Sequence, residues 1–250
     1  MPHSSNCYYI LSLGCPKNEV DSDLMSSLLE RWGWQRADKA EQATLLIVNT
    51  CSFITAAVEE AIESILEICD LREKGRRKVV VAGCLVARYG ASTLASLLPE
   101  VDLFLDFGDY DRLGRLADSV TGGRSAEDKP DLCRRFSSTL RQGYVFIKIS
   151  EGCRRKCSYC TIPSIRGPLR SRAWEDVQEE ADWFLKRGAK ELVLVAQDTT
   201  SYGLDIYGKP SLPFLIDRIA ELDGDFMIRV MYLHPDGVGT ELLATSRQVV

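Results

Sequence analysis

The sequence has few of the features that mark membrane, secreted or zinc-binding proteins. No apolar run reaches the roughly 18 to 20 residues that a transmembrane helix needs. The first residues, MPHSSNC, lead directly into a strand-like run, so we expect no signal peptide. Histidine is scarce, with two residues in 250, at positions 3 and 234. These features predict a cytoplasmic protein with no membrane partner.

Composition excludes further classes. The hydrophobic fraction of 45% and the charged fraction of 27% are typical of globular proteins, so a collagenous or disordered chain is excluded. Charge is unevenly spread: the window 131–172 has a net charge of +8, whereas the whole chain has −5. This window is interpreted either as a solvated face or as a surface that attracts a carboxylate cofactor or an anionic partner. The acidic pI near 5.3 argues against a general nucleic-acid surface.

What the chain has in excess is cysteine. Nine are present, an odd number that complete internal pairing cannot satisfy. Disulfides are rare in the cytosol, so clustered cysteines in a cytosolic chain indicate metal or redox chemistry.

The first half of the chain alternates strand-like and helix-like patterns. This order predicts βαβ units and therefore an open, mostly parallel sheet with helices on both faces. One helix, at 54–72, has apolar residues at the spacing of a single face: Val58, Ile62, Ile65, Leu66 and Cys69. The predicted strands span 8–13, 44–48, 78–82 and 101–105, and the other helices lie near 19–32, 88–98 and 110–120.

A polar, Gly-rich stretch, TGGRSAEDKP, predicts a linker. We therefore divide the chain into an N-terminal α/β domain (1–120), a linker (121–141) and a second domain (142–250). Strand–helix order continues in the second domain, which predicts a parallel (β/α) barrel with its site at the carboxyl ends of the strands. Strands are expected at 144–149, 191–196 and 226–232, and helices near 174–187 and 213–222. Three strands make only an incomplete barrel.

Three cysteines occupy equivalent places in the first domain. Cys15, Cys51 and Cys84 each follow a predicted strand and precede a predicted helix. In an open α/β sheet these strand ends share one edge, where ligands bind, so the three thiols should converge. A nearby helix N-terminus would favour the thiolate, which is the form that binds metal. The alternative is three independent buried cysteines. The remaining Cys7, Cys69 and Cys133 lack such positions and are interpreted as structural.

A second triplet opens the second domain. Cys153, Cys157 and Cys160 form C-x3-C-x2-C directly after a predicted strand. A cubane iron–sulfur cluster takes four ligands, so three cysteines leave one iron open to a cofactor or substrate. The spacing differs from that of bacterial ferredoxins. A zinc site is the alternative, but zinc favours paired C-x2-C knuckles or histidines, and the chain has a single C-x2-C.

Polar residues follow the other strands of the second domain. Gln197 and Asp198 come directly after the strand at 191–196, and His234 follows the next strand. Gln197 is predicted to line a cofactor pocket, and His234 is a further candidate. Helix or turn capping is the alternative for each, above all for Asp198. Tyr159, inside the second triplet, is predicted to contact a cofactor through its backbone or ring.

These motifs resemble a known family. C-x3-C-x2-C with an aromatic before the last cysteine is similar to the signature of the radical S-adenosylmethionine (SAM) enzymes, and the preceding three-cysteine domain resembles that of their methylthiotransferases. SLGCPKNEVDSD, YCTIPSIRGPLRSR and AQDTTSYG resemble the RimO-type members. The MiaB-type transfer-RNA enzymes tend to have Gln-Met-Asn where this chain has Pro16, Lys17 and Asn18. They also tend to have a glutamate in the block that reads RGPLRSR (166–172) in this chain.

The resemblance implies a radical-SAM transferase that adds a methylthio group to the β-carbon of an aspartate in the twelfth-named protein of the small ribosomal subunit. It implies two 4Fe–4S clusters, held by Cys15, Cys51 and Cys84 and by Cys153, Cys157 and Cys160, together with SAM. No protein side chain need act as a nucleophile. An electron donor such as flavodoxin or ferredoxin is an implied partner. The MiaB-like activity on transfer RNA and a non-catalytic iron–sulfur or zinc module remain alternatives.

The resemblance also implies further structure. Radical-SAM barrels of this family use about six strands and are followed by a small β-domain called TRAM. We therefore expect residues 1–250 alone to be poorly active even if the cysteines bind iron.

Overall fold

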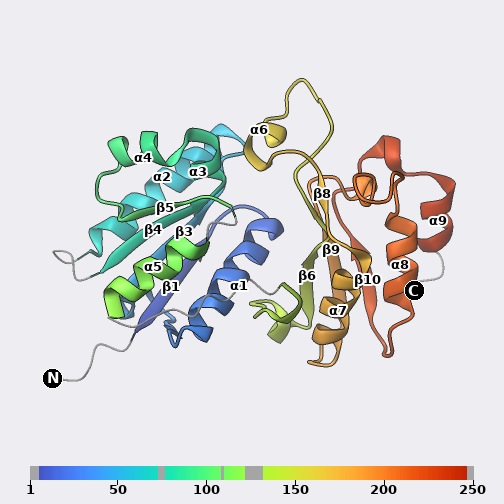
Figure 1. Cartoon of the computed structure of the whole chain (residues 1–250), viewed down its shortest axis with the longest axis horizontal. Coiled ribbons are helices and arrows are strands. Elements are labelled where there is room, and N and C mark those ends of the chain that lie inside the picture. The colour runs from blue at the N-terminus through green and yellow to red at the C-terminus, as the bar shows by residue number, and fades with distance from the viewer. Residues whose placement is uncertain (1–5, 73–76, 108–109, 122–131, 247–250) are drawn as a thin grey trace. The chain divides into compact units, whose positions relative to one another are not determined.

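The computed structural model describes residues 6–72, 77–107, 110–121 and 132–246 (Figure 1). They form two compact units, Met1–Asp131 and Leu132–Val250. Of the linker predicted at 121–141, residues 122–131 lie outside the described residues, and 132–141 belong to the second unit. In the described part of the chain, no helix combines the length and apolarity that crossing a membrane requires.

The first unit is built on a five-stranded sheet in the order β2-β1-β3-β4-β5, and every pairing is parallel. This confirms the predicted open parallel sheet. The short edge strand β2 was not predicted, because it consists of two exposed polar residues. The strands are β1 (Cys7–Ser12), β2 (Gln35–Arg36), β3 (Leu45–Thr50), β4 (Lys78–Gly83) and β5 (Leu103–Leu105). The helices are α1 (Pro16–Arg31), α2 (Thr55–Asp70), α3 (Cys84–Tyr89), α4 (Ala91–Leu97) and α5 (Tyr110–Thr121).

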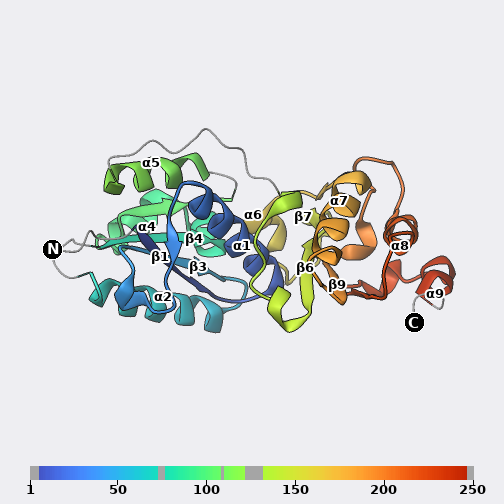
Figure 2. The same cartoon turned by 90° about the horizontal axis from the view of Figure 1, so that it is seen from below.

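Helices cover both faces of this sheet because successive strand residues point to opposite sides. On β3, Leu45 and Ile47 pack in one core with side chains of α1 and α5, whereas Leu46 and Val48 pack in the other with side chains of α2, α3 and α4. Figure 2 shows α5 and α2 on opposite sides of the strands. The near-continuous apolar strands are typical of a parallel sheet buried on both faces.

Two local predictions in this unit were wrong. The helix expected at 88–98 is interrupted at Gly90, whose φ of +80° lies outside the helical region, so α3 and α4 are separate. On α2 the buried residues are Ala61, Ile65 and Ile68, while Ile62 is 38% exposed and Leu66 47% exposed. The apolar stripe of α2 is wider than the strip that a helix buries against a sheet, so its outer half remains exposed.

Gly83, the last residue of β4, fits only without a side chain. Its φ is +91°, and a Cβ there would overlap Asn49 Oδ1 and lie 2.7 Å from the Thr50 carbonyl oxygen. Gly90 has a similar φ of +80°, but nothing lies within 4 Å of its Cβ position. Substituting each glycine by alanine therefore distinguishes the cost of a strained φ, which both share, from the cost of steric overlap, which only Gly83 has.

We predict that Gly83→Ala lowers the free energy of unfolding by about 2–5 kcal/mol, because strain and overlap add. Gly90→Ala is the matched control and should cost about 1–2 kcal/mol from strain alone. Denaturant unfolding of both variants measures the difference; equal losses would contradict the overlap.

The second unit contains three parallel strands in the order β10-β9-β6, with helices in the connections. This is the strand–helix alternation predicted for the first part of a (β/α) barrel. Val145, Ile147, Leu192 and Leu194 of the strands pack with Phe184 and other helix residues in a single core. The main elements are β6 (Tyr144–Lys148), α7 (Trp174–Leu185), β9 (Glu191–Val195), α8 (Leu212–Ala220), β10 (Met227–Val230) and α9 (Thr240–Ser246). A small antiparallel pair, β7 (Ser150–Glu151) with β8 (Arg170–Ser171), and α6 (Ile162–Arg166) were not predicted.

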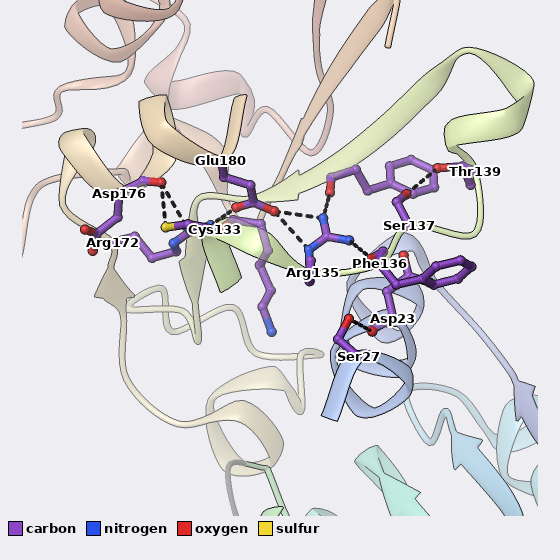
Figure 3. Close-up of polar contacts among 12 residues, drawn as sticks. Asp23, Ser27, Cys133, Arg135, Phe136, Ser137, Thr139, Arg172, Asp176 and Glu180 are labelled. Atoms are coloured by element: carbon purple, nitrogen blue, oxygen red, sulfur yellow. Dashed lines mark hydrogen bonds and ion pairs between the residues drawn. The ribbon is translucent and has the colours of Figure 1, made fainter. Parts of the chain in front are cut away.

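A buried ion-pair group joins the start of this unit to α7. The Glu180 carboxylate pairs with Arg135 at 2.9 Å and also with Arg172 (Figure 3). The side chains of Arg135 and Glu180 are 0% exposed. Arg172 also donates to the Lys148 carbonyl oxygen at 3.0 Å, so the group reaches the carboxyl end of β6.

We predict that Glu180→Gln lowers the free energy of unfolding by about 3–5 kcal/mol, because it leaves a guanidinium buried without its carboxylate. Its neighbour Glu179 provides the control. Glu179 is 54% exposed and pairs with an exposed Arg134, so Glu179→Gln should cost less than about 1 kcal/mol. Similar losses in denaturant unfolding for the two variants would contradict this account.

Candidate functional site

The first cysteine triplet lies along one edge of the first unit. Cys15 occupies the position directly before α1, after β1; Cys51 directly follows β3, and Cys84 directly follows β4 and begins α3. These three strands are neighbours in the sheet, where adjacent strands are about 4.8 Å apart. The strand order also reverses between β1 and β3, which is where open α/β sheets bind ligands. The structure therefore places all three cysteines at one edge, as the sequence predicted.

Asn18 connects the three loops that carry these cysteines. Its Nδ2 donates to the carbonyl oxygens of Leu13 at 2.9 Å and Thr50 at 2.8 Å, which precede Cys15 and Cys51 in their loops. Its Oδ1 accepts from the thiol of Cys84 at 3.8 Å. Asn18 is completely buried, so each of these contacts replaces water that the side chain cannot reach.

Asn49, near the end of β3, hydrogen-bonds to α1 and so holds Asn18 in position. Its Nδ2 donates to the Asn18 carbonyl oxygen at 2.7 Å and to Ser22 Oγ at 2.9 Å. Neither asparagine was singled out from the sequence as a site residue. The available signal was position: Asn18 lies in the first turn of α1, three residues after Cys15, where a side chain can reach back to the preceding loop.

We predict that Asn18→Ala destabilises the first unit by about 2–3 kcal/mol, because the buried Thr50 carbonyl group and the partly buried Leu13 carbonyl group lose their donor. The loops should also loosen, so Cys15, Cys51 and Cys84 of metal-free protein should react faster with an alkylating reagent. Peptide mass spectrometry measures those rates. The exposed Ser96→Ala, which removes a bond within α4, should leave them unchanged; unchanged rates in Asn18→Ala would contradict the connecting role.

The second triplet lies on the loop that follows β6 and β7. Cys153 is 9% exposed, and Cys157 and Cys160 are half-buried and joined by a turn in which Cys160 N donates to the Cys157 carbonyl oxygen. Burial raises the pKa of the Cys153 thiol, although a hydrogen bond from Arg155 N to its sulfur at 3.4 Å opposes that rise.

The spacing of the thiols bears on what they could hold. Among the described residues, no three His, Cys, Asp or Glu side chains are grouped to hold a single metal ion. In a four-iron cluster each cysteine binds a different iron, so its sulfurs need not approach one common ion. Three thiols on one edge or one loop, with hydrogen-bonded backbone around them, fit such a ligand set.

Glu151 is the centre of a polar network at the carboxyl end of β6. Its carboxylate accepts from Lys148 at 2.7 Å, from Arg166 at 3.1 and 3.2 Å, and from Gln197 at 2.6 Å. Burial raises the pKa of Glu151, but the charges of Lys148 and Arg166 together with the hydrogen bonds from Lys148 and Gln197 outweigh burial and lower the pKa to about 2. Glu151 is therefore ionised at neutral pH and joins the end of β6, the end of α6 and the loop after β9. Lys148, Glu151 and Arg166 were not predicted as site residues.

Gln197 and Tyr159 present groups that the described protein does not use. Gln197 donates its amide to Glu151, and its buried Oε1 has no hydrogen-bond partner among the residues that the structure describes. Tyr159 is 81% exposed, so its ring is available for stacking.

Two other candidates act as caps. Asp198 accepts from Thr200 N at 3.1 Å and caps a short 3₁₀ turn, which confirms the capping alternative for this residue. His234 Nδ1 accepts from Asp236 N at 3.3 Å and caps the next 3₁₀ turn. The structure thus gives His234 a local structural task.

Comparison with known proteins divides the chain as the fold does. Residues 7–106 match the uncharacterized protein family UPF0004, and residues 147–245 match the radical SAM superfamily. The first match covers the unit with the distributed triplet, and the second covers the unit with the C-x3-C-x2-C loop.

Curated relatives match across both units. The ribosomal protein uS12 methylthiotransferase RimO of Carboxydothermus hydrogenoformans is 45% identical over 240 residues, which is 94% of this chain and 54% of that protein. The protein of the same name from Thermotoga maritima is 40% identical over 95% of this chain and 55% of its own length. The chain therefore spans about half the length of the curated relatives that it matches.

Solved structures share the fold at low identity. The radical SAM methyltransferase TsrM of Kitasatospora setae, solved with cobalamin and a 4Fe–4S cluster, has a TM-score of 0.63 at 16% identity and covers 96% of this chain and 58% of its own. The cobalamin-dependent SAM radical enzyme OxsB has a TM-score of 0.57 at 10% identity and covers 89% of this chain and 38% of its own. These likenesses concern the fold alone.

Proposed function

The chain belongs to the radical SAM methylthiotransferase family and resembles its RimO-type members, and from this premise we propose that it adds a methylthio group to the β-carbon of an aspartate in ribosomal protein uS12. The observation that carries the proposal is the presence of two cysteine triplets, one in each unit: the first lies at the carboxyl ends of three parallel strands, and the second lies on the loop that follows β6 and β7. Family membership implies 4Fe–4S clusters and SAM as cofactors.

The six cysteines are the proposed cluster ligands. Cys153, Cys157 and Cys160 would hold the cluster that binds SAM, and Cys15, Cys51 and Cys84 would hold the auxiliary cluster. Three ligands per cluster leave one iron of each for a non-protein ligand. When bound, the cluster of the second triplet and SAM would supply one-electron chemistry able to break the unactivated C–H bond of an aspartate side chain. The protein's part is to bind, orient and exclude water.

Gln197 and Tyr159 are the proposed cofactor contacts. The Oε1 of Gln197 would accept a hydrogen bond from SAM, and Glu151 keeps that oxygen oriented by binding the other end of the amide at 2.6 Å. Tyr159, within the cysteine loop, would offer its ring or backbone to the cofactor. No side chain is assigned as a nucleophile.

The partners follow from the reaction. The substrate is a protein of the small ribosomal subunit, and the relatives' name supports uS12. An electron donor such as flavodoxin or ferredoxin would supply the reducing electron. A MiaB-like activity on transfer RNA is the alternative with the same chemistry. A non-catalytic iron–sulfur or zinc module would use the same cysteines without cleaving SAM.

Iron analysis with single-cysteine variants tests the assignment. We predict about eight irons per reconstituted chain, and about four in Cys157→Ala or Cys51→Ala. Cys157→Ala should abolish reductive SAM cleavage, whereas Cys51→Ala should retain it. Cys69→Ala is the matched control and should keep both clusters. One zinc per chain, or cleavage surviving in Cys157→Ala, would contradict the assignment.

Mass spectrometry of uS12 from cells with and without this gene tests the substrate. We expect the methylthio mass increment only in cells that carry the gene. Methylthiolated transfer RNA with unmodified uS12 would instead support the MiaB-like alternative.

A further inference from the structure

Two adjacent arginines of the cysteine loop have different surroundings. In the segment Cys153-Arg154-Arg155-Lys156-Cys157, the Arg155 side chain is 25% exposed and makes three polar contacts within the second unit. Arg154 and Lys156 are exposed, and neither forms an ion pair in the part of the chain that the structure describes. The Arg155 side chain therefore contacts the rest of the second unit, whereas those of Arg154 and Lys156 are exposed to solvent.

Arg155 forms an ion pair with the carboxylate of Asp198, which its own loop also holds in place. Arg155 Nε donates to Asp198 Oδ2 at 2.5 Å, and the Asp198 side chain is 4% exposed. Asp198 also accepts from Thr200 N at 3.1 Å, from the Thr200 hydroxyl and from Ser201 Oγ at 2.7 Å. Burial raises the pKa of Asp198, but these hydrogen bonds and the Arg155 charge lower it below its ordinary value. Thr200 and Ser201 thus hold the Asp198 carboxylate in place independently of Arg155.

Arg155 also reaches the loop after β10. Its Nη1 lies 3.4 Å from Asp236 Oδ2, and its Nη2 lies 3.5 Å from Thr200 Oγ1. Gly237 packs directly on Thr200, so closely that a Cβ at Gly237 would overlap it. One guanidinium therefore ties the cysteine loop to the loops that follow β9 and β10.

The backbone of the same residue faces a ligand sulfur. Arg155 N donates to Cys153 Sγ at 3.4 Å. Hydrogen bonds to the sulfurs of an iron–sulfur cluster are among the factors that set its reduction potential, because they stabilise the more negative, reduced form. The side-chain anchor of Arg155 thus holds in place a donor that would act on the cluster.

We propose that Arg155, fixed by Asp198, is a positioning residue that holds the C-x3-C-x2-C loop in its binding shape before iron is present and keeps Arg155 N on the Cys153 sulfur, which makes the cluster easier to reduce. This inference rests on the proposed function in one respect only: the loop must hold an iron–sulfur cluster.

The competing explanation is that Asp198 acts through its charge alone. Removing a nearby negative charge would make a cluster easier to reduce, because reduction adds an electron. Loss of the positioned N–H would make it harder to reduce. Asp198→Asn, which keeps the size of the side chain, therefore separates the two explanations by the sign of the change.

The test uses the 250-residue chain with Cys15, Cys51 and Cys84 replaced by alanine, so that only the second triplet can take up a cluster. An EPR-monitored redox titration gives the reduction potential. We expect Asp198→Asn and Arg155→Ala each to make the cluster about tenfold harder to reduce, which is a shift of about 59 mV for one electron. The double variant should show the same shift in reduction potential as either single variant, not the sum of the two shifts, because Asp198 and Arg155 act together. Arg154→Ala is the matched control and should change the potential little.

A second measurement needs no cluster. In metal-free protein, alkylation of Cys153 should be several-fold faster in Asp198→Asn and Arg155→Ala than in Arg154→Ala, with unchanged circular dichroism. An unchanged or raised potential in Asp198→Asn, or alkylation as slow as in the control, would overturn the positioning role. A parent chain that takes up no iron on this loop would instead overturn the proposed function, so the two failures are distinguishable. If a variant cannot hold the cluster, its alkylation rate decides.

Discussion

The direction of parallel strands is the constraint on which the rest of this structure depends. Every strand of both main sheets runs the same way as its neighbours, so the loops that leave the carboxyl ends emerge at one edge of each sheet. Chemistry-bearing residues that are 36 and 33 positions apart, such as Cys15, Cys51 and Cys84, are thereby brought to the same edge of the sheet although they lie far apart in the sequence. The register enforces this: Thr50 pairs with Gly83, so Cys51 and Cys84 leave the sheet at the same level.

Each edge is then organised by a buried polar side chain that serves several loops. Asn18 does this in the first unit through its amide, and Glu151 and Asp198 do it in the second through carboxylates. Such groups are stable only when nearly all their hydrogen-bonding atoms are satisfied, which makes the surrounding backbone geometry stringent.

Sequence reasoning was most successful where the pattern is long or local. The strand–helix order, the placement of the first triplet after the carboxyl ends of strands and the C-x3-C-x2-C loop were predictable, because hydrophobic periodicity and residue spacing indicate them. The helix break at Gly90 and the set of α2 residues that are buried could not be predicted. A single positive φ and the width of a helix–sheet contact have little effect on the hydrophobic periodicity of a sequence. Asn18, Arg155 and Glu151 were missed because their importance lies in partners 32 to 46 residues away, which one sequence does not reveal.

The two triplets differ in how far apart along the chain their cysteines lie, and this has a consequence for folding. Cys153, Cys157 and Cys160 fall within eight consecutive residues, so an unfolded chain can bring them together at small entropic cost. Cys15, Cys51 and Cys84 come together only when β1, β3 and β4 are paired. A metal group bound to the distributed set binds the native state almost exclusively and adds its full binding free energy to the stability of that unit. The local set can retain part of its affinity in the unfolded chain, so loading it stabilises its own unit less.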